Sequence, residues 1–268
     1  MTYQENYQKW LDFAELPAYL RDELVAMDEK TKEDAFYTNL EFGTAGMRGL
    51  IGAGTNRINI YVVRQATEGL AQLIDSKGEE AKKRGVAIAY DSRHFSPEFA
   101  FESAQVLAAH GIKSYVFESL RPTPELSFAV RHLHTFAGIM VTASHNPAPF
   151  NGYKVYGEDG GQMPPADADA LTDYIRAIEN PFTVQLADLE ESKANGLIEV
   201  IGENVDAEYL KEVKGVNINQ DLINEYGRDM KIVYTPLHGT GEMLARRALA
   251  QAGFEAVQVV EAQAVPDA

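Results

Sequence analysis

Three short apolar runs, separated by segments with helical patterns, constrain the fold of this chain most strongly. The runs span residues 86–90, 112–117 and 136–142, and their length is typical of buried strands. Segments 59–78 and 96–111 each combine an N-capping residue (a serine in the second case) with apolar residues at helical spacing. Strands and helices that alternate in this way predict an α/β fold, with a mixed, mostly parallel sheet sandwiched between helices.

The rest of the sequence indicates where the chain divides. Weaker signals predict short helices over 7–13 and 17–27, a helix over 124–132, a short strand over 153–156 and mostly helical sequence over 164–215. The pattern weakens over 216–228, and a strand, a glycine-rich turn, a helix and a strand follow it. We therefore predict a first α/β domain over residues 1–215, then a linker and the incomplete start of a second α/β domain over residues 216–268.

A second domain that is cut short would leave apolar side chains without partners. Leu244, Leu249 and Val257 are the side chains that we expect to be exposed in this way. Exposed apolar patches drive association. The sequence therefore predicts self-association through the truncated second domain, or disorder after about residue 215.

Charge and cysteine content exclude several classes of function. The 40 acidic and 24 basic residues give a formal net charge of −16, which repels nucleic acid and anionic membranes. A phosphorylated ligand is repelled too, so a phosphate site must gather its own cations. The absence of cysteine excludes disulfides and thiolate metal sites. No apolar run reaches the ~18 residues of a membrane span and the polar N-terminus is unlike a signal peptide, so we expect a cytoplasmic protein without membrane or nucleic-acid partners.

The segment Thr142-Ala-Ser-His-Asn-Pro147 contains the first candidate for chemistry. Ser144 follows the third apolar run, at the end of a strand where α/β sheets bind ligands. Spacing alone leaves two interpretations open: a nucleophile or phosphate carrier, or an ordinary loop serine. Adjacent residues seldom face each other as serine–histidine proton transfer requires, which weakens a Ser144–His145 pair. A hydrolase would also need a Gly-x-Ser-x-Gly turn, and Ala143 and His145 stand at the flanking positions.

Two cations are candidates for the neighbourhood of Ser144. Asn151-Gly152 is typical of a tight turn, which would bring Lys154 back toward Ser144 as a charge clamp or proton-transfer group. Arg48 ends a glycine-lined turn, and backbone amides together with a guanidinium suit phosphate oxygens. Each cation has a plain alternative: a solvated lysine at a strand edge, and an arginine paired with one of the many acids.

Three further residues lie in loops that follow predicted strands. Asp91 and Arg93 follow the first apolar run, and a local ion pair between them would shape their loop. His238 lies in the turn Thr235-Pro-Leu-His-Gly-Thr-Gly241, where turn geometry alone would explain the glycines.

Taken together, five sequence motifs resemble those of the α-D-phosphohexomutase superfamily, and most of all those of its bacterial phosphoglucomutase (phosphoglucomutase/phosphomannomutase) branch. They occur in the family's order and cover essentially the whole chain. The motifs are Phe42-Gly-Thr-Ala-Gly-Met-Arg-Gly49, Tyr90-Asp-Ser-Arg93, Val141-Thr-Ala-Ser-His-Asn-Pro147, Asn151-Gly-Tyr-Lys154 and Thr235-Pro-Leu-His-Gly-Thr-Gly241.

The resemblance implies roles for individual residues. Ser144 would carry the phosphoryl group, Lys154 and His145 would flank the reacting oxygens with Lys154 in acid/base work, and Arg48 would hold the phosphoserine. Supporting roles for the substrate or the loop would fall to Asn146, Thr44, Asp91, Arg93 and His238.

The resemblance also implies a reaction and its cofactors. The family interconverts glucose 1-phosphate and glucose 6-phosphate through a phosphoserine, with a hexose 1,6-bisphosphate as activator and intermediate. Mg²⁺ would bridge the phosphoserine and an Asp-Gly-Asp-x-Asp-Arg loop, a run that does not occur in these 268 residues. Ser144, through its phosphate, is the one metal contact expected here, because nothing in the spacing of Asp91 and Asp159 supports them as substitute ligands.

The missing metal loop leads to an expectation about activity. We expect the chain to be the N-terminal part of a phosphoglucomutase with a sugar-phosphate substrate, and a weak or inactive catalyst alone. Two kinds of alternative stay open: a phosphomannomutase or phosphopentomutase with the same chemistry, or a non-catalytic phosphosugar-binding module.

Overall fold

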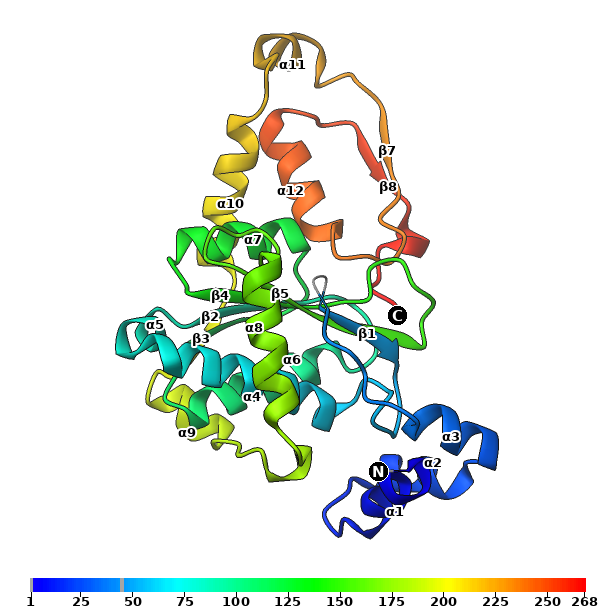
Figure 1. Ribbon diagram of the computed structural model, residues 1–268. Coiled ribbons are helices and arrows are strands. Elements are labelled where there is room, and N and C mark those ends of the chain that lie inside the picture. Colours follow the sequence, from blue (N-terminus) through cyan, green and yellow to red (C-terminus); the bar gives the residue numbers. More distant parts are fainter. Residues whose placement is uncertain (1, 44–45) are drawn as a thin grey trace.

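Residues 2–43 and 46–268 are described by a computed structural model (Figure 1). The helices are α1 (Tyr3–Asp12), α2 (Ala18–Ala26), α3 (Glu29–Phe36), α4 (Ile60–Lys77), α5 (Glu79–Arg84), α6 (Ser96–Ala109), α7 (Thr123–His132), α8 (Pro165–Ala177), α9 (Leu189–Ala194), α10 (Glu203–Gly215), α11 (Gln220–Tyr226) and α12 (Glu242–Ala252), with short 3-10 turns at Pro181–Thr183 and Glu261–Gln263. The strands are β1 (Met47–Leu50), β2 (Val86–Tyr90), β3 (Ser114–Phe117), β4 (Ala137–Val141), β5 (Phe150–Tyr156), β6 (Ile198–Ile201), β7 (Ile232–Tyr234) and β8 (Val257–Val259).

A six-stranded sheet forms the centre of the larger part of the molecule. Its strand order is β1-β5-β4-β2-β3-β6. Strands β4, β2, β3 and β6 pair in parallel, whereas β5 runs antiparallel to both β4 and β1. The predicted mixed, mostly parallel α/β sheet is therefore confirmed.

Helices cover both faces of this sheet, as Figure 1 shows with α7 and α10 on one side and α4, α6 and α9 on the other. Alternate residues of β2 point to opposite faces, as strand geometry requires. Val86, Ile88 and Tyr90 join the core beneath α4 and α6, and Ala87 and Ala89 join the core beneath α7. Burying one such isoleucine stabilises the fold by about 1.5–3 kcal/mol. None of the helices in the described ranges is long and apolar enough to cross a membrane.

The three N-terminal helices pack together at the β1 end of the sheet (Figure 1). Trp10 of α1 is 2% exposed and makes edge-to-face contacts with Phe36, Tyr61 and Phe182. These aromatic contacts tie the helical module α1–α3, defined here as residues 2–36, to α4 and to the turn after α8.

A smaller, two-stranded parallel sheet of β7 and β8 follows α11, with α12 between the two strands in sequence. Helix α12 packs on α10. The expectation that Leu244 is exposed is wrong: its side chain is 5% exposed, while Leu249 and Val257 are half-buried. The region 216–228, predicted to be a linker, contains helix α11.

Three local predictions, around Asn151, Arg48 and Ser96, need correction. Asn151-Gly152 forms no turn; both residues lie inside β5, and the chain reverses earlier, where the Phe150 amide donates to the Pro147 carbonyl. Arg48 lies on strand β1 rather than in a turn. Ser96 is the first residue of α6 and not its N-cap; that position belongs to Phe95, in a left-handed conformation with φ 64°.

Candidate functional site

Ser144 lies in the loop between β4 and β5, hereafter the Ser144 loop (residues 142–150). Its backbone is left-handed, with φ 57°, a conformation that costs a residue with a Cβ about 1–2 kcal/mol. The Ser144 amide donates to Thr142 Oγ1 at 2.9 Å, which supports this conformation. The side chain is exposed, and its Oγ lies 3.3 Å from His145 Nδ1. The adjacent serine and histidine therefore do face each other, contrary to the expectation from sequence.

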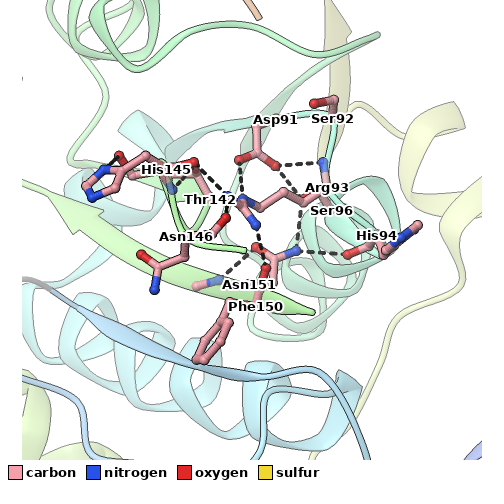
Figure 2. Close-up of polar contacts among 12 residues, drawn as sticks. Asp91, Ser92, Arg93, His94, Ser96, Thr142, His145, Asn146, Phe150 and Asn151 are labelled. Carbon is pink, nitrogen blue, oxygen red and sulfur yellow. Dashed lines mark hydrogen bonds and ion pairs between the residues drawn. The ribbon is translucent and has the colours of Figure 1, made fainter. Parts of the chain in front are cut away.

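Arg93 points its guanidinium at the Ser144 loop and holds it through hydrogen bonds (Figure 2). Its guanidinium donates to four backbone carbonyls of the loop: those of Ser144, Asn146, Pro147 and Phe150, at 2.5–3.0 Å. The residue is 8% exposed, so these bonds form largely away from water. A planar, always charged group with several donors is suited to this role. The loop conformation that presents Ser144 is therefore set largely by one buried side chain.

Asp91 and Asn151 fix the loop that carries Arg93. Asp91 lies 3.5 Å from Arg93 Nε, and its Oδ1 accepts from the Arg93 amide at 3.0 Å and from the Ser96 hydroxyl at 2.8 Å. Asn151 is fully buried, and its side chain donates to the His94 carbonyl and to Ser96 Oγ (Figure 2). The local Asp91–Arg93 ion pair is present. Asn151 was missed as a functional candidate because its turn-like sequence context hid its place inside a strand.

Arg48 reaches the other side of the Ser144 loop from β1. It pairs with Gly152 across the β1–β5 ladder, and its Nη1 donates to Asn146 Oδ1 at 2.8 Å. Gly46, just before β1, packs so closely on β5 that an added Cβ would lie 2.2 Å from the Tyr153 carbonyl oxygen. With φ 84° as well, only glycine is suited to this position. Thr44 lies outside the described residues.

Lys154 is a half-buried cation on β5, opposite Met140 of β4. Burial lowers its pKa below the ordinary lysine value, and the like charge of Arg48 lowers the pKa further, while Asp91 opposes both effects. In residues 2–43 and 46–268, no carboxylate forms an ion pair with it. A lysine with a lowered pKa is better able to exchange a proton near neutral pH.

A cavity of about 530 Å³ brings the loops of the two sheets together. Ser144, His145, Asp91, Arg93 and His238 all line it, whereas Arg48 and Lys154 do not. The imidazole Nδ1 of His238 lies 2.8 Å from the carbonyl oxygen of Val265 and so donates to it, and its backbone is left-handed with φ 62°. The turn that carries His238 therefore faces the Ser144 loop across this cavity.

A larger cavity, of about 720 Å³, lies between α1, α4 and α8. None of the candidate residues that the structure describes lines it. We place the functional site at the smaller cavity, because the exposed serine and the buried arginine clamp are there.

The described residues do not form a magnesium site by themselves. Within them, no three histidine or acidic side chains are grouped so as to hold a metal ion. The Asp91 carboxylate is occupied by Arg93 and Ser96, and Asp159 accepts the Gly161 amide in another loop. The expected contact between a metal and a phosphate on Ser144 stays a prediction, and we derive no chemical step through a metal.

Two family models match the chain. "Phosphoglucomutase/phosphomannomutase, alpha/beta/alpha domain I" matches residues 39–182, more than half of the chain, and the corresponding domain II model matches residues 207–268. The phosphoglucomutase of Staphylococcus saprophyticus is 37% identical over 248 residues, which are 92% of this chain and 44% of that protein. The phosphoglucomutase of Staphylococcus haemolyticus is 39% identical over 265 residues, which are 97% of this chain and 45% of that protein. The chain thus spans less than half the length of these curated relatives.

Solved structures share the fold. The structure of a putative phosphomannomutase from Thermus thermophilus has a TM-score of 0.70 and 25% identity, over 86% of this chain and 47% of that one. The open form of parafusin, a phosphoglucomutase from Paramecium, has a TM-score of 0.61 at 18% identity, over 86% of this chain and 44% of that one. The second likeness concerns the fold alone.

Proposed function

This chain belongs to the phosphoglucomutase/phosphomannomutase family, and from that premise we propose that it is the phosphoserine-bearing part of a phosphoglucomutase. The enzyme would interconvert glucose 1-phosphate and glucose 6-phosphate through a hexose 1,6-bisphosphate. The observation that carries the proposal is the exposed, left-handed Ser144, whose loop is clamped by the four hydrogen bonds of Arg93.

In the proposed reaction, the phosphoryl group passes from Ser144 Oγ to a free hydroxyl of the sugar phosphate. The bond between phosphorus and Oγ breaks, a bond between phosphorus and the sugar oxygen forms, and the hydroxyl proton passes to a base. Oγ of Ser144 takes up a proton in return. In the second half of the cycle, the other phosphoryl group of the bisphosphate returns to Ser144 by the reverse steps.

Lys154 and His145 are our candidates for these proton transfers. The lowered pKa of Lys154 makes the neutral amine more accessible than in an ordinary lysine, and a neutral amine can accept a proton and later return it. His145 already lies within 3.3 Å of Ser144 Oγ through Nδ1. Both side chains can therefore accept and donate a proton, and His145 also lies close enough to Ser144 Oγ to do so.

Two nearby arginines would offset the negative charge of a phosphoserine in this acidic protein. A phosphoserine carries about −1.5 to −2 charges at pH 7, against a chain of net charge −16. Arg48 bonds to the Ser144 loop through Asn146, and Arg93 bonds to its backbone. Phosphoryl transfer depends on such positioning and charge neutralisation. Mg²⁺ and a hexose 1,6-bisphosphate remain part of the proposal, with the metal at the phosphate of Ser144 and its other ligands outside the described residues.

A single-turnover experiment tests the proposal and selects the sugar. Because the chain alone is expected to be a weak catalyst, the full-length protein that the proposal implies would be mixed in turn with a small excess of glucose 1,6-bisphosphate, mannose 1,6-bisphosphate and ribose 1,5-bisphosphate in the presence of Mg²⁺. We expect release of glucose monophosphate up to one equivalent of protein, and no release with Ser144→Ala. Ser76→Ala, which changes an exposed serine on α4 that bonds only to Leu73 of its own helix, is the control and should behave as the wild type.

The outcomes separate the alternatives. Preference for the mannose or ribose compound would replace phosphoglucomutase by phosphomannomutase or phosphopentomutase. Binding of a bisphosphate without release of any monophosphate would favour a non-catalytic phosphosugar-binding module and contradict the proposal.

A further inference from the structure

The N-terminal helical module lies outside the residues matched by the domain I family model, which begin at residue 39. One of its helices, α2, nevertheless contacts two segments that lie next to groups bonded to the Ser144 loop, around Phe95 and around Gly52. Tyr19 and Glu23 are one turn apart on α2, so they share a face of the helix. Both line a small cavity of about 120 Å³ together with Ile51, Gly52 and Phe95.

The first contact runs through Phe95. The Tyr19 ring stacks on the Phe95 ring with centroids 5.5 Å apart, and Phe95 stacks in turn on Phe99. Phe95 is left-handed, and such a conformation persists only where its surroundings hold it. It is two residues from Arg93, whose carbonyl accepts from the Ser96 amide across it. The Tyr19 stack therefore supports the turn that aims the Arg93 guanidinium at the Ser144 loop.

The second contact runs through the segment after β1. Glu23 Oε2 accepts from the Ala53 amide at 2.9 Å. Its carboxylate lies so close to Gly52 that an added Cβ there would be 2.4 Å from Oε1. The neighbouring Ile51 amide donates to the Pro149 carbonyl at 2.8 Å, at the far end of the Ser144 loop. Glu23 therefore holds the segment that closes this loop.

We propose that α2 is a positioning element for the Ser144 loop, with Tyr19 and Glu23 as positioning residues that act through Phe95 and through Gly52–Ala53. This inference deepens the proposed function of the same site, because it concerns how the proposed phosphate carrier is held. Neither residue touches the reacting atoms. Their effect is on the populations of the loop conformations.

Amide hydrogen exchange of the unphosphorylated chain tests this inference. The loss variants are Tyr19→Ala and Glu23→Ala, and the conservative variants are Tyr19→Phe, which keeps the ring, and Glu23→Gln, which keeps an acceptor oxygen. Val25→Ala and Asp22→Ala are matched controls, since both side chains are exposed on the same helix.

We expect each loss variant to speed exchange in peptides spanning residues 93–96 and 144–150 roughly threefold to tenfold, the effect of losing one aromatic stack or one buried hydrogen bond. Exchange in β2 should stay unchanged, and the Nε–H resonance of Arg93 should shift in NMR spectra. The conservative variants and the controls should resemble the wild type.

Two results would overturn the inference. Unchanged exchange of the Ser144 loop in both loss variants would show that α2 does not position it. Equal acceleration in β2 would show that α2 only stabilises the whole domain. Neither result depends on phosphorylation of Ser144, so failure here is distinguishable from failure of the proposed function, which appears as missing phosphoryl transfer.

Discussion

A single buried guanidinium, that of Arg93, bonds to four backbone carbonyls of the Ser144 loop and so fixes most of that loop's backbone. We expect Arg93→Ala to lower the free energy of unfolding by about 2–4 kcal/mol, because charged hydrogen bonds to several carbonyls are lost together. Arg93→Lys should recover only part of this, since an ammonium lacks the planar fork. Urea unfolding measures the free energy of unfolding of both variants. Arg176→Ala, an exposed arginine, is the control and should change stability by less than about 0.5 kcal/mol.

The pKa of Lys154 reports on its neighbours. Burial is the main cause of its lowered pKa, and Arg48 adds to the effect. We therefore predict that Arg48→Gln raises the pKa of Lys154 without restoring the ordinary value. An NMR titration of the lysine Cε resonances gives the answer. A pKa that stays the same or falls in the variant would contradict the arrangement of these two cations.

The sequence indicated which residues are candidates for the site better than it indicated which atoms those residues contact. The motifs around Ser144 and Arg93 pick out two loops that line one cavity, whereas Lys154 lies on β5 outside that lining, and the roles of all three residues stay predictions. The four carbonyl contacts of Arg93 were not predictable, because they depend on where β4 and β5 bring the backbone of a distant loop. The support from Asn151 was missed for the same reason.

At the scale of elements, His110 ties three helices together on one side of the sheet. It follows α6, and its ring bonds to Glu68 and Asp75 of α4; Asp75 also pairs with Lys82 of α5. The hydrogen bond to Glu68 is the largest cause that raises the pKa of His110 to about 9 from 6.5. Since the folded pKa is the higher one, the charged histidine stabilises the fold below pH 6.5, and this stabilisation is lost as the pH rises to about 9.

We predict that the free energy of unfolding falls by about 1–2 kcal/mol across this range, a value reduced for solvent screening of a half-buried group. The variant His110→Gln should lack this slope and match the wild type more closely at pH 9 than at pH 6. Urea unfolding at intervals of pH tests this. The same slope in the variant would assign the titration to another group.

Long, strongly patterned elements were predictable, and short ones were not. Helix α4 with its Asn59 cap and strands β2 and β4 lie where the periodicity places them. Strand β6 was hidden in acidic, helix-rich sequence, because its four residues form an edge strand with two exposed side chains. The left-handed cap at Phe95 carries no local signal, because tertiary stacking holds it.

At the scale of the whole molecule, a cluster of charged side chains around the buried Arg121 links the loop after β3 to helices α10 and α12. Arg121 is 1% exposed and donates to Asp206 of α10. Arg247 of α12 makes two hydrogen bonds to Glu203 at 2.7–2.8 Å and lies 3.6 Å from Asp206. Burial and the nearby Asp206 raise the pKa of Glu125, which favours a protonated carboxyl in the cluster.

Arg247 is therefore expected to hold α12 against α10. Arg247→Ala should speed amide exchange in α12 and in the β7–β8 sheet, and leave β2 unaffected. Arg246→Ala is the matched control, since Arg246 pairs with Glu242 of its own helix. Equal effects of the two variants would show that the ion pairs to α10 do not hold this part of the chain in place.

The measurement that tests the central claim most directly is the location of a phosphoryl group. The full-length protein that the proposal implies would be incubated with glucose 1,6-bisphosphate and Mg²⁺, digested, and its peptides sequenced by mass spectrometry. We predict one phosphoryl group, on Ser144, that disappears when glucose 6-phosphate is added afterwards. Phosphorylation at another residue, or none at all, would contradict the assignment of Ser144 as the phosphate carrier.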